Sequence, residues 1–489
     1  MLRAGADRGP GISWIGQFFV PLGLVIGSID KALLLSLTLA QTLSLFLLYV
    51  AVLRLERSRI AVASLSVMSA AATPLFVGLG HLYLVESFQV LAVSWFVFIL
   101  ASANLWPRAF IIGQLLAAGA FAILMKATTP CYCLLLGLAA LGYAARPDRP
   151  WGLRDMKTKV VLGVALLLSL AVLFWYKQNF VAVVQHSRIA ASGPIAALWG
   201  KEDTVLNTLG YWLGQIQPNF FLPAVLVGSC VLVVLALPTL RPRLLASNPD
   251  LVRPAVCAGA ALLQILGSLL LFSFGANRVG RFLLPILPCM ALLISWASAR
   301  LGKGKIVPWL ALSLYLGQFI LVHGQVLGLI APNRSITGFL WQRHRDKVGV
   351  ELADEIVART CIYRRGENTY LNILAIAPEL KGDWLGPAPA RYAVAKRFGR
   401  RIPCEYAYAG SSFFGADIET TWQEVLRLQP HYIITNDPTI YPSPKNSINR
   451  SVSLESHHAL LSQIRNSGLF MIDGPMRADP GFITFRRRD

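Results

Sequence analysis

Four ionisable residues stand at the ends of long apolar segments, where charge is expensive. Glu86 opens one such segment, Lys126 ends another, and Arg278 and Arg281 precede a third. An ionisable group near a bilayer core is a candidate for function, because its burial costs free energy that a partner or ligand must offset. Arginine binds phosphate through two parallel hydrogen bonds. One acid and three cations on one membrane face would therefore suit an anionic, phosphate-bearing ligand.

Each of these residues also has a simpler interpretation. Lysine and arginine at the ends of spans often extend to lipid headgroups and have no further role. The simpler interpretation is weaker for Glu86, because a carboxylate gains nothing from anionic headgroups. His81, Tyr83 and Asn277 lie beside these residues in the sequence and are candidate accessory residues. A lone histidine such as His81 is more often a bystander than a proton donor.

The elements that must position these residues are membrane-spanning helices. Of the 489 residues, 55% are hydrophobic and 14% are charged, which is too apolar for ordinary soluble domains. A span needs roughly 20 mostly apolar residues, and segments of this kind recur from residue 12 to residue 330. The sequence predicts about ten spans, at residues 32–53, 60–80, 84–104, 109–125, 128–144, 160–176, 219–240, 255–275, 282–300 and 306–330. The stretch 12–28 is either a further span or a helix lying in the membrane interface.

Basic residues are concentrated in every second connection between the predicted spans, namely 54–59, 108, 146–159, 241–253 and 300–305. Short cytoplasmic loops are rich in lysine and arginine, so this alternation places the four ionisable residues and everything after residue 331 outside the cytoplasm. The loop 177–218 then also lies outside, and its aromatic residues suit interfacial helices. The net charge of +20 has the same origin. No basic stripe with aromatic residues follows, so nucleic acid is not an expected partner.

Residues 331–489 predict a small α/β domain after the membrane domain of residues 1–330. Strands are expected at 371–377, 431–435 and 482–486, and helices at 350–359, 420–428 and 455–466, which favours a partly parallel sheet covered by helices. This domain has no glycine-rich phosphate loop and no catalytic serine motif. Cys361 and Cys404 are its two cysteines, and we predict that they form a disulfide. No metal site is expected at Cys131 and Cys133, which lack acidic or histidine companions.

Four passages of the membrane domain resemble the elements of a known family. They are 32–59 followed by 61–76 with its Thr73-Pro74 kink, Glu86-Ser-Phe-Gln-Val-Leu91, Lys126-Ala-Thr-Thr-Pro130 and Arg281-Phe-Leu-Leu-Pro-Ile-Leu-Pro288. Together they are similar to polyprenol-phosphate-dependent glycosyltransferases of the GT-C fold, which include protein O-mannosyltransferases and lipid A aminoarabinose transferases. That family usually begins with a further span and an outer loop carrying an aspartate. We expect this chain to lack both, since Asp7 and Asp30 are its only early acids, and an inactive chain is then one alternative.

The resemblance implies a sugar donor linked to a polyprenyl phosphate. Lys126, Arg278 and Arg281 would then bind the donor phosphate, and Glu86 would take the proton from an acceptor hydroxyl. No cofactor is implied, a divalent metal is left open, and the acceptor is a glycan, lipid or protein on the periplasmic or lumenal side. We expect a bacterial inner membrane, with the endoplasmic reticulum as the alternative. Two other functions remain open: a transporter or flippase of an anionic or lipid-linked substrate, and a membrane scaffold without activity.

Overall fold

The computed structural model describes residues 10–56, 59–81, 83–192, 203–245, 248–275, 278–301, 306–331, 346–361, 371–376, 394, 397, 404–408, 418–436, 454–477 and 482–488. The chain divides into two compact units, each described separately below. The first unit comprises residues 1–188 and 202–341, and the second comprises residues 189–201 and 342–489. The sequence-based boundary near residue 331 lies ten residues before the second break.

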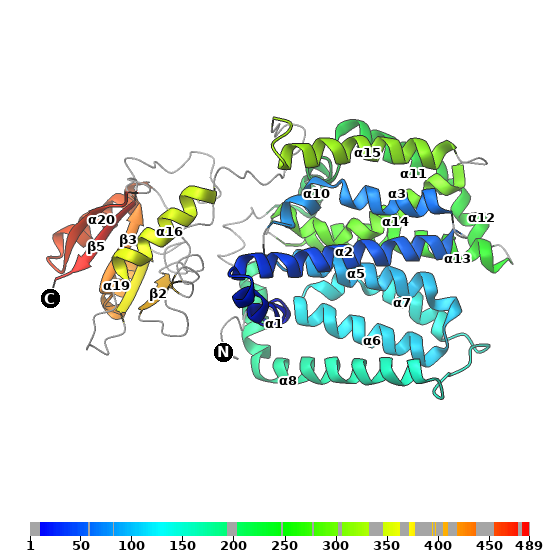
Figure 1. Ribbon diagram of the computed structural model, residues 1–489, viewed down its shortest axis with the longest axis horizontal. Coiled ribbons are helices and arrows are strands. Elements are labelled where there is room, and N and C mark those ends of the chain that lie inside the picture. Colours follow the sequence, from blue (N-terminus) through cyan, green and yellow to red (C-terminus); the bar gives the residue numbers. More distant parts are fainter. Residues whose placement is uncertain are drawn as a thin grey trace. The chain divides into compact units, whose positions relative to one another are not determined.

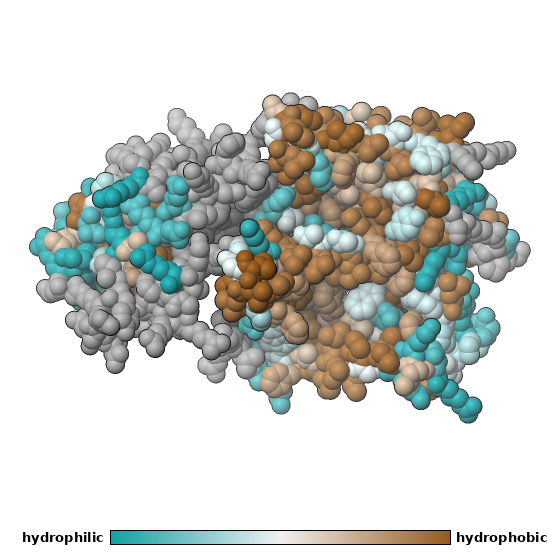
Figure 2. Space-filling view, in the orientation of Figure 1, coloured by the Kyte–Doolittle hydropathy of each residue, from teal (hydrophilic) through white to brown (hydrophobic). Residues whose placement is uncertain are grey.

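The first unit is a bundle of apolar helices (Figure 1). Within the described residues, eight helices are long and apolar enough to cross a membrane, and they correspond to eight of the ten predicted spans. Their helical cores are α2 (Ile29–Leu55), α5 (Glu86–Ser102), α6 (Arg108–Met125), α8 (Met156–Ser192), α11 (Pro223–Ala236), α13 (Pro249–Ser273), α14 (Leu287–Leu301) and α15 (Ile306–Val326). Short helices η1 (Ala103–Leu105), η3 (Leu237–Thr239) and α12 (Leu240–Leu244) extend two of them. Figure 2 shows apolar side chains over the flank of the bundle.

The other two predicted spans are broken helices. Residues 60–80 form α3 (Ile60–Ala71) and α4 (Pro74–Leu79), and residues 128–144 form η2 (Thr129–Tyr132) and α7 (Leu134–Ala144). Proline disfavours the helical conformation of the residue before it, and Thr73 is accordingly extended, with φ −72° and ψ 122°. The count of about ten spans therefore includes two interrupted helices.

A buried glutamine hydrogen-bonds to backbone groups at the break between α3 and α4. Gln318 on α15 is 1% exposed. Its Nε2 donates to the carbonyl oxygens of Ala72 at 3.0 Å and Phe220 at 2.9 Å, and its Oε1 accepts from the Leu222 N–H at 2.9 Å. No water hydrogen-bonds to backbone inside a bilayer, so groups released by a helix end must find partners within the protein. One side chain thus satisfies three backbone groups from two chain breaks.

The break at η2 and α7 has an equivalent arrangement. Gln264 on α13 is 2% exposed. Its Nε2 donates to the Cys131 carbonyl at 2.8 Å, and its Oε1 accepts from the Leu135 N–H at 2.9 Å. Neither glutamine was predicted from the sequence to have a role.

The first helix, α1 (Gly11–Val25), has 15 residues and is too short to span a bilayer core. It lies across the direction of α2 (Figure 1), and its residue Ile12 packs with Leu124 and Met125 at the end of α6. Of the two alternatives for residues 12–28, the structure favours the interfacial helix.

The loop predicted at 177–218 is largely helical. The 37 residues of α8 extend to Ser192, and at 1.5 Å per residue such a helix is longer than the roughly 30 Å of a bilayer core. A second helix, α10 (Val205–Phe220), begins where the Thr204 hydroxyl caps the Asn207 N–H at 3.2 Å. The predicted span start at residue 219 is therefore wrong, because 219 and 220 still belong to α10 and α11 begins at Pro223. Trp199, one of the aromatic residues in the predicted loop 177–218, lies outside the described residues.

The second unit contains the predicted α/β domain. Its five strands are β1 (Leu371–Ile376), β2 (Cys404–Tyr408), β3 (Tyr432–Asn436), β4 (Phe470–Pro475) and β5 (Phe482–Arg487), in the order β2-β1-β3-β5-β4. The pairs of β1 with β2 and β3 are parallel, and those of β5 with β3 and β4 are antiparallel. The helices are α16 (Asp346–Thr360), α19 (Ile418–Leu428) and α20 (Leu454–Asn466). The three predicted strands and three predicted helices are present, whereas β2 and β4 were missed.

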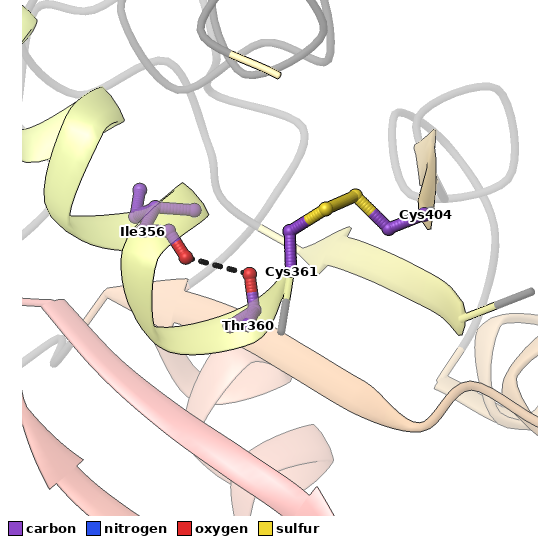
Figure 3. Close-up of a disulfide and its surroundings, with 4 residues drawn as sticks. All are labelled: Ile356, Thr360, Cys361 and Cys404. Carbon is purple, nitrogen blue, oxygen red and sulfur yellow. Dashed lines mark hydrogen bonds between the residues drawn. A yellow bond between two sulfur atoms is a disulfide. The ribbon is translucent and has the colours of Figure 1, made fainter. Parts of the chain in front are cut away.

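A disulfide joins Cys361, directly after α16, to Cys404 at the start of β2 (Figure 3). The two Cα atoms are 5.7 Å apart, within the range that a disulfide bridges without backbone movement. The predicted pairing is confirmed.

We predict that Gln318→Leu lowers the free energy of unfolding by about 2 kcal/mol or more, because the buried partners of Gln318 lose their hydrogen bonds. Unfolding of the purified protein in mixed micelles, followed as a function of dodecyl sulfate, measures this. Gln17→Leu on the exposed side of α1 is the matched control, with an expected change within about 0.5 kcal/mol. Equal stability of the two variants would contradict the role given to Gln318.

Candidate functional site

The beginning of α5 positions Glu86. The carboxylate is in the first helical turn, where the helix dipole favours negative charge. Its side chain is 2% exposed, so it does not face lipid. The neighbouring Ser87 hydroxyl accepts from Gln41 Nε2 on α2 at 3.3 Å. The start of α5 is thus held against α2.

Arg281 reaches Glu86 from a segment that is not α-helical. This segment is the 3-10 helix η4 (Gly280–Ile286), with Pro285 inside it. Arg281 Nε lies 3.3 Å from Glu86 Oε1, and the arginine side chain is 36% exposed. The second carboxylate oxygen, Oε2, is buried and accepts no hydrogen bond from the described residues. A buried acid and a half-exposed cation therefore form one pair.

Lys126 joins this pair through an aromatic ring. It follows the last residue of α6 in an extended conformation, with φ −162° and ψ 139°. Its Nζ lies 4.4 Å from the centroid of the Phe282 ring, and the Arg281 Cζ lies 5.8 Å from the same centroid. Both distances suit cation–π contacts. The structure thus brings Lys126 and Arg281 together on the ring of Phe282, with Glu86 next to Arg281.

Two hydrogen bonds connect the three segments that carry these residues. Gln89, one turn after Glu86 on α5, donates from Nε2 to Thr129 Oγ1 in η2 at 3.0 Å. Tyr132, at the end of η2, donates its hydroxyl hydrogen to the Phe282 carbonyl at 2.7 Å. With the pair of Glu86 and Arg281, these bonds link α5, η2 and η4 in a closed triangle.

Arg278 pairs with Asp203 and not with Glu86. Its NH2 lies 3.3 Å from Asp203 Oδ2 and donates to Thr208 Oγ1 at 3.1 Å, and Tyr211 donates to its carbonyl at 2.7 Å. Hydrogen bonds from the Asn207 side chain and then from the Thr204 N–H lower the pKa of the Asp203 carboxyl, and Arg278 lowers it further. Arg278 thus holds α10 in place, and its assignment as a phosphate ligand stays a prediction.

The three accessory candidates separate in the structure. The Tyr83 hydroxyl donates to the Ile12 carbonyl at 2.8 Å and so holds α1. His81 is exposed after α4. Asn277 lies outside the described residues. Gln89, Tyr132 and Phe282 take places in the site that were not predicted. One available signal was the glutamine three positions after Glu86 in an otherwise apolar helix.

Arginines of the basic connections meet at the other end of the same helices. Arg253, which is 9% exposed, donates to Asn104 Oδ1 at 2.5 Å and to the Arg54 carbonyl at 2.7 Å. Glu56, directly after α2, pairs with Arg300 at the end of α14. These contacts satisfy helix ends, so this cluster has a structural explanation.

No protein-family model and no curated protein sequence matches this chain. Among solved structures, the fold is similar to that of ArnT from Cupriavidus metallidurans bound to undecaprenyl phosphate. The TM-score is 0.55 at 14% identity, over 98% of this chain and 88% of that one. It is also similar to the arabinofuranosyltransferase AftD from Mycobacteria, with a TM-score of 0.49 at 12% identity, over 96% of this chain and 35% of that one.

The first of these likenesses establishes the fold. The chain has a GT-C-like membrane fold, an α-helical polytopic membrane domain together with a small C-terminal α/β domain. This agrees with the resemblance drawn from the four sequence passages. Apolar helices of spanning length and this fold define an integral, multi-pass membrane protein.

We predict that Tyr132→Phe destabilises the protein by about 1–2 kcal/mol, because the buried Phe282 carbonyl loses its donor. The midpoint of thermal unfolding in lipid nanodiscs measures the effect. Tyr143→Phe on α7, another buried tyrosine of the bundle that takes no part in the site, is the control. A fall of equal size in both variants would show that the bond to Phe282 has no special role.

Proposed function

We propose that this chain is a membrane glycosyltransferase that moves a sugar from a polyprenyl phosphate to an acceptor hydroxyl. The observation that carries the proposal is the gathering of Arg281 and Lys126 on the ring of Phe282, next to Glu86. The GT-C fold supports it, and so does the undecaprenyl phosphate bound to the ArnT neighbour.

The reaction needs stabilisation of a departing phosphate. The acceptor oxygen bonds to the anomeric carbon of the sugar, and the bond between that carbon and the phosphate oxygen breaks. The electron pair stays with the phosphate, and the acceptor proton passes to a base. Fixed cations directed at the developing charge stabilise it strongly in a site that excludes water. Arg281 and Lys126 take this role in the proposal.

Binding through Arg281 has a direct test. Arg281→Ala should weaken binding of undecaprenyl phosphate at least about tenfold, because a charge-assisted contact is lost where little water replaces it. Native mass spectrometry of the purified chain with the lipid measures binding. Arg108→Ala, at the end of α6 opposite to Lys126, is the matched control, and its binding should stay within about threefold. Unchanged binding in Arg281→Ala, or an equal loss in the control, would contradict the proposed phosphate site.

We also propose that the site end of the bundle and the C-terminal domain face away from the cytoplasm. The alternation of basic connections supports this orientation. The bond between Cys361 and Cys404 supports it as well, because disulfides persist in oxidising compartments.

The orientation predicts the behaviour of fused reporters. Alkaline phosphatase, which is active only outside the cytoplasm, should be active when fused after Asp489 and inactive when fused after Lys157. Enzyme activity per amount of fusion protein in intact cells is the measurement, and a reporter active inside the cytoplasm serves as the control at both positions. The reverse pattern would overturn the orientation.

A further inference from the structure

We propose that Glu86 is a positioning residue, which orients Arg281 toward the lipid phosphate and does not take the acceptor proton. This inference rests on the proposed function, because it concerns the same phosphate. It changes the role that the sequence alone suggested for Glu86. The contact between the two side chains carries the inference, since Glu86 Oε1 faces Arg281 Nε at 3.3 Å.

Glu86 contacts the Nε atom of Arg281, and this determines which donors of the guanidinium remain for a ligand. A guanidinium has donors at Nε and at two terminal amino groups, and phosphate is bound through two parallel hydrogen bonds. The carboxylate of Glu86 lies at Nε in an ion pair without a hydrogen bond, and this arrangement leaves both terminal amino groups for a ligand. The Arg281 side chain is 36% exposed, whereas that of Glu86 is 2% exposed. The cation, and not the acid, is thus the group that a ligand reaches.

Burial argues against proton transfer to Glu86. A general base must come within about 2.6–3.2 Å of the hydroxyl that it deprotonates. Oε1 is occupied by Arg281, and Oε2 is buried. An acceptor would reach the carboxylate only after Arg281 had moved, and the site would then lose its phosphate contact.

The contacts around Glu86 hold this residue in a fixed position, from which it can orient Arg281. The residue is in the first turn of α5, and both its neighbour Ser87 and Gln89 one turn later are bonded to other segments. A long arginine side chain has many rotamers, and a carboxylate on a rigid element restricts them before the ligand binds. Glu86 therefore presents Arg281 in one orientation.

Three substitutions of Glu86 separate position from charge. Glu86→Gln keeps the size of the side chain and removes the charge that attracts Arg281, whose Nε makes no hydrogen bond within the described residues. Glu86→Asp keeps the charge and withdraws it from Nε by one methylene group. Glu86→Ala removes the carboxylate. All three are compared with Arg281→Ala in the full-length chain, with undecaprenyl phosphate as the binding probe. Turnover is followed as release of undecaprenyl phosphate from lipid-linked sugars of the host membrane.

Because the contact is an ion pair, the positioning role predicts that Glu86→Gln weakens binding of the lipid at least about tenfold. Glu86→Ala and Glu86→Asp should each weaken binding at least about tenfold, and Glu86→Ala should add nothing to the loss caused by Arg281→Ala. A fall in kcat of about a hundredfold or more in Glu86→Gln, with binding unchanged, would identify a base and overturn the proposal. Unchanged binding in Glu86→Asp and Glu86→Ala would overturn it too.

A second measurement keeps this inference separate from the proposed function. If the wild-type chain does not bind undecaprenyl phosphate, the proposed function fails, and hydrogen exchange without any ligand then tests the positioning. Amides of residues 278–286 should exchange faster in Glu86→Gln, Glu86→Asp and Glu86→Ala than in the wild type, because each variant loses or weakens the ion pair. Equal exchange in all four proteins would overturn the role of Glu86.

Discussion

Backbone groups that leave a helix inside a bilayer must find partners in the protein, and the membrane domain depends on meeting this requirement. Residues 126–133 and 278–286 interrupt the helical bundle, and the site is built from these interruptions. Gln264 and Gln318 supply hydrogen bonds to several of the released backbone groups. Tyr132 does the same for the Phe282 carbonyl.

The interruptions explain how charged groups come together. An unbroken helix carries its side chains around a cylinder, whereas a chain that ends a helix can turn toward its neighbours. Lys126 follows the end of α6, and Arg281 lies in a 3-10 segment before α14, so both reach the ring of Phe282. Glu86 contacts Arg281 because Glu86 lies in the first turn of α5, next to the segment η4 that carries Arg281. The ion pair compensates the burial of the carboxylate, which alone would be costly.

The sequence predicted those elements correctly for which a single strong pattern exists. Long apolar runs predicted the eight spanning helices, and short apolar runs predicted three strands of the C-terminal sheet. Two cysteines in an otherwise cysteine-free domain predicted the disulfide. The edge strands β2 and β4 were missed, because they carry mixed residues such as Glu405 and Asp473 that do not repeat with a clear period.

The site could be predicted only in part. Charged residues at span ends pointed to Glu86, Lys126 and Arg281, because charge is rare in such sequence. The partner of Arg278 could not be found in this way, since Asp203 is distant in the sequence and belongs to a connection without a family motif. Likewise, Gln318 bonds to residues about 100 and 250 positions away, and no local pattern encodes such pairings.

We propose that the cations around Phe282 bind a lipid phosphate. A structure of the chain in lipid nanodiscs with undecaprenyl phosphate tests it most directly. The phosphate is expected within hydrogen-bonding distance of the terminal amino groups of Arg281 and close to Lys126 Nζ. Glu86 is expected to keep its contact with Arg281 Nε. A phosphate bound at the Arg253 and Arg300 end of the bundle, with the Phe282 site vacant, would contradict it.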